Sequence, residues 1–427
     1  MSGRNLLRIA VALTLSTSMW FYVQKILIPY QQQDTVANNR PAGNFSDLYP
    51  RWLGARELLL NGRDPYSPEV TRDIQVGYYG RALDPNRPSD PKDQQAFAYP
   101  VFVVFLLSPT VSLPFSEVQQ VFLWVLLVAT VATIPLWLRF LQWRASNSMI
   151  AVVILLTVGS LPVVQALKLQ QLSLLVAGLV ALALALLVRG DLVLPGILMA
   201  VAMIKPQLTV PLAGWLSLWA LINWRDRGRY LLSFGVSLGL LLAGSEWILP
   251  GWLIRFQTAV ESYQVYAHSH SLLDALLGDT AGRVAAAAIV AAILLLCWKA
   301  KAVAANSPHF SWTCSTVLAA TVVIIPTISP YNQVLLLPAI LQVARQWPEL
   351  VMERPIAHRL AWFCGAVVVW PWLATSTLMF LSAVFPARAI QQWWPLPFYP
   401  VLLAPLAVLV LQSVSWRPIP ERQVSLS

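Results

Sequence analysis

The sequence predicts an all-α protein that crosses a membrane many times, and its composition, hydropathy and apolar runs all indicate this. Hydrophobic residues make up 57% of the 427 residues, and charged residues make up only 11%. The mean hydropathy is +0.63. A soluble chain carries about 25% charged residues, so this chain cannot cover a water-exposed surface with charge. We therefore exclude a soluble enzyme, a nucleic-acid-binding protein and a fibrous protein.

The first apolar run extends from Leu6 to Ile28 and follows Arg4 and Arg8. It is longer than the apolar part of a signal peptide, and no A-x-A cleavage site follows it. We interpret it as a first spanning helix whose N-terminus lies in the cytoplasm. Residues 29–98 then form an extracytoplasmic loop inserted after this span.

This loop has the pattern of an amphipathic helix near its start. Ser46 or Asp47 is a plausible N-cap, and Asn61-Gly62 is a plausible end. The apolar positions between them share one helical face and are Leu48, Trp52, Ala55 and Leu59. We expect this helix to lie on the outer membrane surface.

Eleven further apolar runs predict the rest of the membrane domain. They cover roughly 117–138, 148–165, 171–188, 192–204, 207–222, 230–250, 283–298, 312–328, 331–344, 360–385 and 398–414. Short basic clusters follow every second run, which predicts about twelve spans with both termini in the cytoplasm. We expect residues 1–427 to form one integral membrane domain, in which 346–427 are C-terminal helices.

Two features of these runs predict a cavity within the membrane domain. The segment 97–113 is bounded by Pro100 and Pro114. If it were a full span, every basic cluster that follows would lie on the outer side of the membrane. We therefore predict a re-entrant or short helix on the outer side. Runs 192–204 and 331–344 are too short to span straight, and such broken helices usually surround a protein-lined cavity.

The charge distribution supports this topology and gives no sign of a polyanionic partner. Residues 29–98 hold nine acids and eight bases, whereas the rest of the chain holds 21 bases and 10 acids. The excess of bases is the cytoplasmic signal of a membrane protein, so we predict no nucleic-acid partner. The four histidines lack zinc-ligand spacing. His268 and His270 could chelate as a pair, but no third ligand is near, and we predict neither a metal nor a cofactor.

Polar residues interrupt three pairs of apolar runs at the same predicted membrane boundary. They are Lys168, Gln170 and Gln171, then Lys205 and Gln207, then Tyr331, Asn332 and Gln333. The chain has six lysines, and two of them occupy these breaks. An ionisable group at membrane depth is costly, which favours a functional reading. Together with Asp47, these residues suit a phosphate-bearing lipid and a step that removes a proton.

Each of these residues also has a structural alternative. Asp47 could serve only as the cap of the loop helix. Lys168 and Lys205 could extend to lipid headgroups. The amides of Gln170, Gln171, Asn332 and Gln333 could satisfy backbone groups at helix ends.

Four stretches of the chain resemble glycosyltransferase family 87. The first is N-F-S-D-L-Y-P-R-W-L-G-A-R-E-L-L-L-N-G-R-D-P-Y at 44–66, which looks like the opening signature of that family. The others are F-A-Y-P-V-F (97–102), K-L-Q-Q-L-S-L-L (168–175) and M-I-K-P-Q-L (203–208). The resemblance extends over about residues 1–345. Its members are membrane mannosyltransferases of the C-type superfamily that use polyprenyl-phosphate sugars.

The resemblance implies a hexosyltransferase that moves mannose from a polyprenyl phosphate to a lipid or glycan acceptor. It places the protein in a prokaryotic plasma membrane, among membrane lipids, with its active site on the extracytoplasmic side. Asp47 would be the catalytic carboxylate, and Gln170, Gln171 and Lys205 would line the cavity. We find no second carboxylate at an equivalent break, which favours inversion. Family members often carry histidines where this chain has Tyr331-Asn332-Gln333, and this departure leaves the donor open.

Two other functions remain consistent with parts of the sequence. A non-catalytic transporter or flippase of lipid-linked sugars would bind the same lipid phosphate, but it should show symmetry between its halves, which we do not detect. A polymerase or ligase of surface polysaccharide would be expected to carry its large outer loop late in the chain. Here the long loop that the sequence indicates is early.

Overall fold

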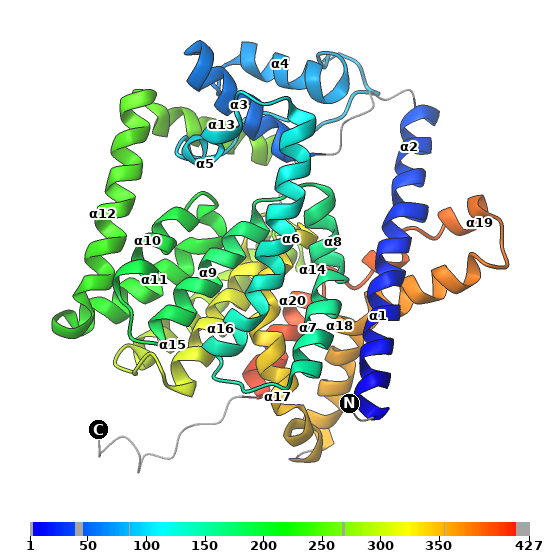
Figure 1. Ribbon diagram of the computed structural model, residues 1–427, viewed down its shortest axis with the longest axis vertical. Helices are drawn as coiled ribbons and strands as arrows, with labels where there is room; N and C mark the ends of the chain where they lie inside the picture. The colour runs from blue at the N-terminus through cyan, green and yellow to red at the C-terminus, as the bar shows by residue number, and fades with distance from the viewer. Residues whose placement is uncertain (1–2, 39–45, 85, 267–269, 354, 416–427) are drawn as a thin grey trace.

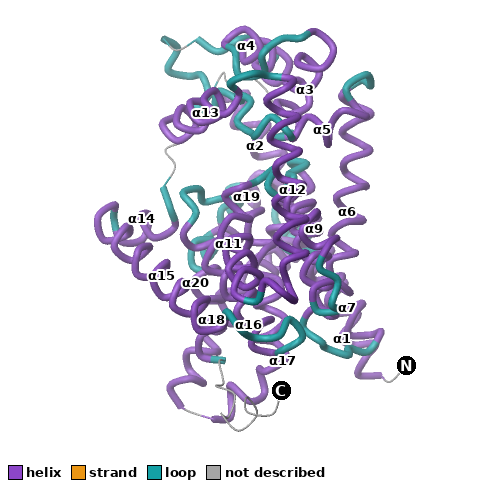
Figure 2. Tube along the Cα trace, turned by 90° about the vertical axis from the view of Figure 1, so that its left-hand side faces the viewer, coloured by secondary structure: helices purple, strands orange, loops and turns teal. Residues whose placement is uncertain are grey.

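A computed structural model of the chain describes residues 3–38, 46–84, 86–266, 270–353 and 355–415. This described part contains helices and no strand, which confirms the all-α prediction (Figures 1 and 2). His268 and residues 44–45 of the first family-like stretch lie outside the described residues.

One long N-terminal helix extends from the lower end of the molecule in Figure 1 to its upper end. It consists of α1 (Gly3–Tyr22), a π-helical turn η1 (Val23–Leu27) and α2 (Ile28–Ala37). It corresponds to the predicted first span, and it continues about ten residues beyond the apolar run that predicted it.

An upper layer of short helices covers one end of the molecule (Figure 1). It contains α3 (Leu48–Asn61), α4 (Pro68–Tyr79), α5 (Val103–Leu107) with the 3-10 turn η2 (Ser108–Thr110), and α13 (Trp252–Tyr266). The segment 97–113 thus forms a short helix and not a span. A short helix is one of the two alternatives that the sequence predicts, the other being a re-entrant segment. Pro100, Pro109 and Pro114 account for the interruptions, because proline lacks the N–H that a continuing helix needs.

Helix α3 confirms the predicted loop helix and shows what its apolar face contacts. Leu48, Trp52 and Ala55 are buried, and Gly62 ends the helix with the left-handed φ of 64° that favours glycine. At Gly54 a Cβ atom would lie about 2.4 Å from the ring of Phe97. This face of α3 therefore packs on the 97–111 segment of the protein.

The helical body below this layer contains the remaining apolar helices. They are α6 (Phe115–Phe140), α7 (Asn147–Val158), α8 (Leu161–Lys168), α9 (Ser173–Leu187), α10 (Val193–Ala202), α11 (Pro206–Ile222), α12 (Trp224–Ile248), α15 (Asp279–Ala300), α16 (Pro308–Ile324), η3 (Pro330–Leu336), α17 (Leu337–Glu353), α18 (Pro355–Leu381) and α20 (Ala404–Val414). Short helices α14 (Leu272–Leu277), α19 (Ala387–Gln391) and η4 (Leu396–Phe398) connect them. Every apolar run predicted from the sequence corresponds to one of these helices or to a bent pair.

The predicted count of about twelve spans is not confirmed. Among the described residues, five helices are long and apolar enough to cross a membrane, and the number rises to six if α7 and α8 are one bent span. These two helices meet at an angle of 55°. Helices α9, α10, α11, α16 and α20 are apolar but have only 10 to 17 residues. Helices α9, α10 and α11 begin or end at the polar breaks 168–171 and 205–207, where polar residues and a proline interrupt the apolar runs.

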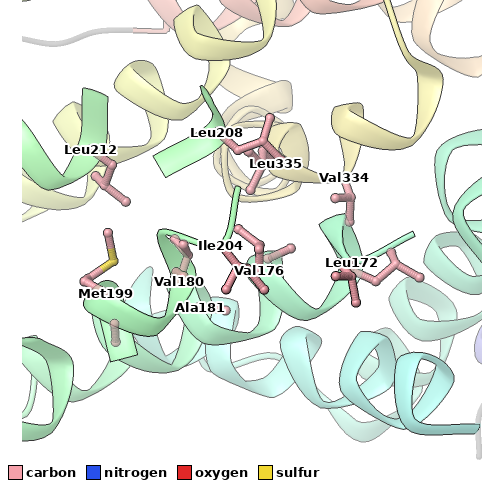
Figure 3. Packing of buried hydrophobic residues seen from close by; sticks show 14 of the residues in the cluster. Leu172, Val176, Val180, Ala181, Met199, Ile204, Leu208, Leu212, Val334 and Leu335 are labelled. Atoms are coloured by element: carbon pink, nitrogen blue, oxygen red, sulfur yellow. The ribbon is translucent and has the colours of Figure 1, made fainter. Parts of the chain in front are cut away.

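The core of the body packs the helices that flank these breaks against one another (Figure 3). Val176 and Val180 of α9 lie with Met199 of α10, Leu212 of α11 and Leu335 of η3 in one buried cluster. Residues next to the breaks, Leu172, Ile204, Leu208 and Val334, belong to the same cluster. Packing of these apolar neighbours brings the three polar breaks to one place.

Candidate functional site

The three breaks differ in backbone geometry. Gln170 has a φ of 45°, which is uncommon for a residue with a side chain, and the chain turns there between α8 and α9. Lys205 has a non-helical backbone and lies directly before Pro206, the first residue of α11. The third break, at Tyr331, Asn332 and Gln333, lies within the 3-10 turn η3. Tyr331 and Asn332 contact the other two breaks as described next.

A chain of hydrogen bonds connects the outer loop to all three breaks. The Gln171 side chain donates through Nε2 to Oδ2 of Asp47 and accepts through Oε1 from Nζ of Lys205 at 2.8 Å. The same Nζ donates to Oγ of Ser173 at 2.7 Å, and Ser173 donates to Oδ1 of Asn332 at 3.0 Å. We call Asp47, Gln171, Lys205, Ser173 and Asn332 the polar chain. One amide thus bridges the carboxylate and the ammonium that the sequence placed at a common site.

The structure excludes the alternative that Asp47 serves as a helix cap. Asp47 precedes α3, but its backbone is helical, with φ −70° and ψ −9°, and its side chain caps no N–H group of the helix. Its backbone N–H donates to the carbonyl oxygen of Leu169 at 2.9 Å, which ties the loop to the first break. The carboxylate of Asp47 instead accepts a hydrogen bond from Gln171, which orients it toward the polar chain.

Lys205 is the buried cation of this site. Its residue is 4% exposed, which excludes the alternative that it extends to lipid headgroups. The rings of Tyr331 and Tyr99 lie near its ammonium, with their centroids 5.2 and 5.8 Å from Nζ. Such rings attract a cation without supplying a negative charge. Among the described ion pairs, none involves Lys205 or Asp47.

A cavity of about 520 Å³ lies beside the polar chain, between the upper layer and the helical body. Its walls include five residues that the sequence predicted to bind substrate, namely Gln171, Lys205, Gln207, Tyr331 and Asn332. Asp47 is not among the lining residues, and its carboxylate is connected to the cavity wall through Gln171. The volume is in the range of ligand pockets.

Three predicted residues lie away from this cavity. Lys168 donates to Oε1 of Gln31 at 2.5 Å, on the N-terminal helix. Gln170 accepts from Ser46 at 2.6 Å and donates to the carbonyl of Leu167, so it stabilises the turn and the start of the loop helix. Gln333 donates to the carbonyl of Val401 at 2.8 Å. For Gln170 and Gln333 these are the structural roles that the sequence left open.

Sequence reasoning missed two parts of the cavity wall. Arg51 of α3 lines the cavity, and helix α13 contributes Gln257, Glu261 and Gln264. Arg255 of α13 pairs with Asp64 of the outer loop at 2.9 Å, and Trp252 packs edge-on against Phe102. The three polar residues recur at helical spacing, and this signal could have indicated a helix facing a polar site.

Two carboxylates besides Asp47 lie at or near the site, although no sequence pattern indicated them. Glu261 lines the cavity. Asp93 of the outer loop lies close enough to interact electrostatically with Asp47 and Arg51. Desolvation raises the pKa of Asp93, a hydrogen bond from the backbone N–H of Gln95 opposes that rise, and the Asp47 carboxylate adds to it.

Comparison with known proteins gives one match. The model of glycosyltransferase family 87 matches residues 97–330, which is more than half of the chain. This range contains the stretches 97–102, 168–175 and 203–208, whereas 44–66 lies outside it. No curated protein and no solved structure matches the chain.

Proposed function

The chain belongs to glycosyltransferase family 87, and from this premise we propose that it transfers a hexose from a polyprenyl phosphate to an acceptor hydroxyl. The family makes it a membrane glycosyltransferase, and its several long apolar helices fit a multi-pass membrane protein. The observation that carries the proposal is the bridge from Asp47 through Gln171 to Lys205 beside a cavity. A base and a buried cation at one site are the groups that such a transfer needs.

In the proposed reaction, the acceptor oxygen attacks the anomeric carbon of the sugar while Asp47 takes the hydroxyl proton. The bond between the anomeric carbon and the phosphate oxygen breaks, and its electron pair leaves with the lipid phosphate. Lys205 neutralises the charge that develops on that phosphate. A single displacement of this kind inverts the anomeric configuration and requires one carboxylate as base.

Gln171 gives Asp47 a defined position in this scheme. It occupies Oδ2 of the carboxylate, and Oδ1 accepts no hydrogen bond from the described residues. The acceptor hydroxyl would approach Oδ1, or it would displace the amide of Gln171 toward Lys205. We therefore assign Gln171 as a positioning residue and Asp47 as the base.

An apolar pocket supports a lipid-linked donor. This pocket has a volume of about 290 Å³ and lies on the other side of η3, where Pro330, Gln333 and Val334 line it. Tyr331 and Asn332 of the same short helix line the polar cavity. A substrate with a charged phosphate and a hydrocarbon chain would use both environments, whereas a water-soluble sugar nucleotide would leave the apolar pocket without a ligand.

Several finer features belong to this proposal and rest on resemblance and topology. They are mannose as the hexose, a lipid or glycan as the acceptor, and the extracytoplasmic face of a prokaryotic plasma membrane as the location. We also propose that the short helices α9, α10, α11, α16 and α20 lie within the membrane around the cavity. This arrangement would account for the twelve apolar runs of the sequence.

The experiment that tests this function is reconstitution of the purified protein in lipid vesicles with radiolabelled polyprenyl-phosphate mannose. A panel of octyl glycosides serves as acceptors on the side that the upper layer faces. We expect labelled disaccharide products whose formation requires the protein. Label that moves to a protected compartment without product would instead support the flippase alternative and contradict the transferase.

A further inference from the structure

Arg51 is a cation of the cavity that the proposed reaction has not yet used. It lies one turn after Asp47 on α3, lines the cavity, and donates through Nη1 to the backbone carbonyl of Asp47. Its guanidinium carbon lies 4.6 Å from the centroid of the Tyr99 ring. Its Nε atom is buried without a hydrogen-bond partner in the described structure. A buried donor without an acceptor is costly, and a ligand in the cavity could supply that acceptor.

Lys205 approaches the same tyrosine from the helical body. Its Nζ lies 5.8 Å from the centroid of the Tyr99 ring, and it lines the same cavity. Tyr99 is 6% exposed, and its backbone carbonyl accepts a hydrogen bond from the hydroxyl of Tyr66 at 2.5 Å. One buried aromatic ring thus lies near a cation of the upper layer and a cation of the body.

Two positive charges around one buried ring repel each other, and an anion bound between them lowers that repulsion. No carboxylate forms an ion pair with either of them among the described residues. The guanidinium offers a planar set of N–H donors that matches a phosphate, and the ammonium offers a point charge. Asp47 lies near both cations and Glu261 lines the same cavity, but neither carboxylate pairs with Arg51 or Lys205, so both cations remain available to a phosphate.

We propose that Arg51 and Lys205 together form a two-cation site for the phosphate of the lipid-linked donor. Arg51 holds the non-bridging oxygens, and Lys205 lies at the oxygen that leaves with the lipid. Because the two cations come from the two layers, the phosphate also holds the upper layer against the body. This inference rests on the proposed function only in that the ligand is a lipid phosphate.

Arg56 provides a matched control on the same helix. Its Nη1 donates to the carbonyl of Val111 at 2.9 Å, and its guanidinium lies 5.5 Å from the ring of Trp52. It therefore resembles Arg51 in having a backbone acceptor and an aromatic neighbour. It differs in that it does not line the cavity.

The test measures binding and does not depend on turnover. The full chain in phosphatidylcholine nanodiscs is titrated with decaprenyl phosphate and with the uncharged decaprenol. We expect Arg51→Gln to raise the Kd for decaprenyl phosphate at least about tenfold and to leave the Kd for decaprenol within about twofold. Arg56→Gln should change neither value by more than about twofold.

Two results would overturn the inference. One is unchanged binding of decaprenyl phosphate by Arg51→Gln, and the other is an equal loss for the phosphate and the alcohol, which would make Arg51 a structural support. If Arg51→Gln does not fold, Arg51→Lys replaces it, because it keeps the charge and loses the planar donors. An unchanged Kd for Arg51→Lys would then contradict the proposed phosphate contact. Arg51-dependent binding without any sugar transfer would uphold the phosphate site and reject the transferase.

Discussion

Charged residues of the outer loop and charged residues of the cavity are held in different ways. In the loop, Arg63 contacts Glu57 at 2.9 Å and Asp73 at 2.7 Å, and Arg81 pairs with Asp90. In the cavity region, Lys205 and Asp47 contact the amide of Gln171, which carries no charge. The loop charges therefore pair directly, whereas the cavity charges are oriented by a neutral amide and form no direct ion pair with each other.

This difference separates charges that hold the fold from charges available to a ligand. A paired charge has little electrostatic attraction left for a substrate. A charge fixed by neutral dipoles keeps its full field and is already oriented, which is the arrangement that stabilises charge developing in a transition state. Substitutions in the two regions should consequently have opposite profiles, with loss of activity in one and small changes of stability in the other.

The largest effect within this comparison is expected for Lys205→Gln. The developing charge on the leaving phosphate would lose its cation, so we expect kcat/KM for sugar transfer to fall about 10²–10³-fold. Lys299→Gln, at an exposed lysine of α15, is the control and should leave transfer unchanged. A Lys205→Gln enzyme with kcat/KM within about threefold of the wild type would refute the division between the two regions.

A smaller loss is expected when the bridge between the two charges is removed. Gln171→Leu keeps the size of the side chain but abolishes the bonds to Asp47 and Lys205. We expect kcat to fall about 10- to 100-fold, with a lesser change in KM, since bonds to charged groups orient the base. Gln165→Leu is the control, because Gln165 is also buried but lies outside the polar chain. Equal kinetics of the two variants would show that orientation by Gln171 is unimportant.

The apolar pocket beyond η3 is a third region, which has no charged lining residue and can be compared with the outer loop and the cavity. Ala344 lines this pocket and its continuation between α17 and α18. Ala344→Trp should raise KM about tenfold for a decaprenyl donor and much less for a donor with a ten-carbon chain, because it fills space that hydrocarbon would occupy. Ala292→Trp on the exposed face of α15 is the control. Equal KM changes for both donors would argue against a hydrocarbon chain in this pocket.

The smallest effect is expected for Asp90→Asn in the outer loop. A hydrogen bond from Arg81 and the backbone N–H of Asp84 lower the pKa of Asp90 to about 2. Because this pKa is below its unfolded value of about 4, the pair stabilises the fold above pH 4 and loses this effect as the pH falls through about 2. We expect the Tm at pH 7 to fall by no more than about 2 °C and the difference from the wild type to shrink toward pH 2. A large loss of transfer activity would contradict a purely structural role.

The sequence predicted those features that depend on local pattern. The helix after Asp47, its end at Gly62 and every apolar helix of the body follow from periodicity and glycine chemistry. The breaks at 168–171 and 205–207 were visible because polar residues interrupt apolar runs. Five of the eight predicted substrate-binding residues line the cavity for the same reason.

The features that the sequence did not predict depend on the backbone and on distant packing. Gln170 and Gln171 are neighbours, yet the positive φ of Gln170 sends one side chain to Ser46 and the other to Asp47. Helix α13 follows an apolar helix and adds a wall to the cavity, which composition alone does not indicate. Arg51 was one of many loop arginines until the structure placed it over Tyr99. The number of spans depends on where short helices lie, and apolar runs alone do not determine it.

The most direct test of the account compares binding and turnover in Asp47→Asn. Asparagine can still accept the hydrogen bond from Gln171 but cannot take a proton at neutral pH. We expect a folded protein that binds decaprenyl phosphate within about threefold of the wild type and transfers sugar at least about 10³-fold more slowly. Turnover close to that of the wild type would show that Asp47 is not the base and would contradict the proposed site.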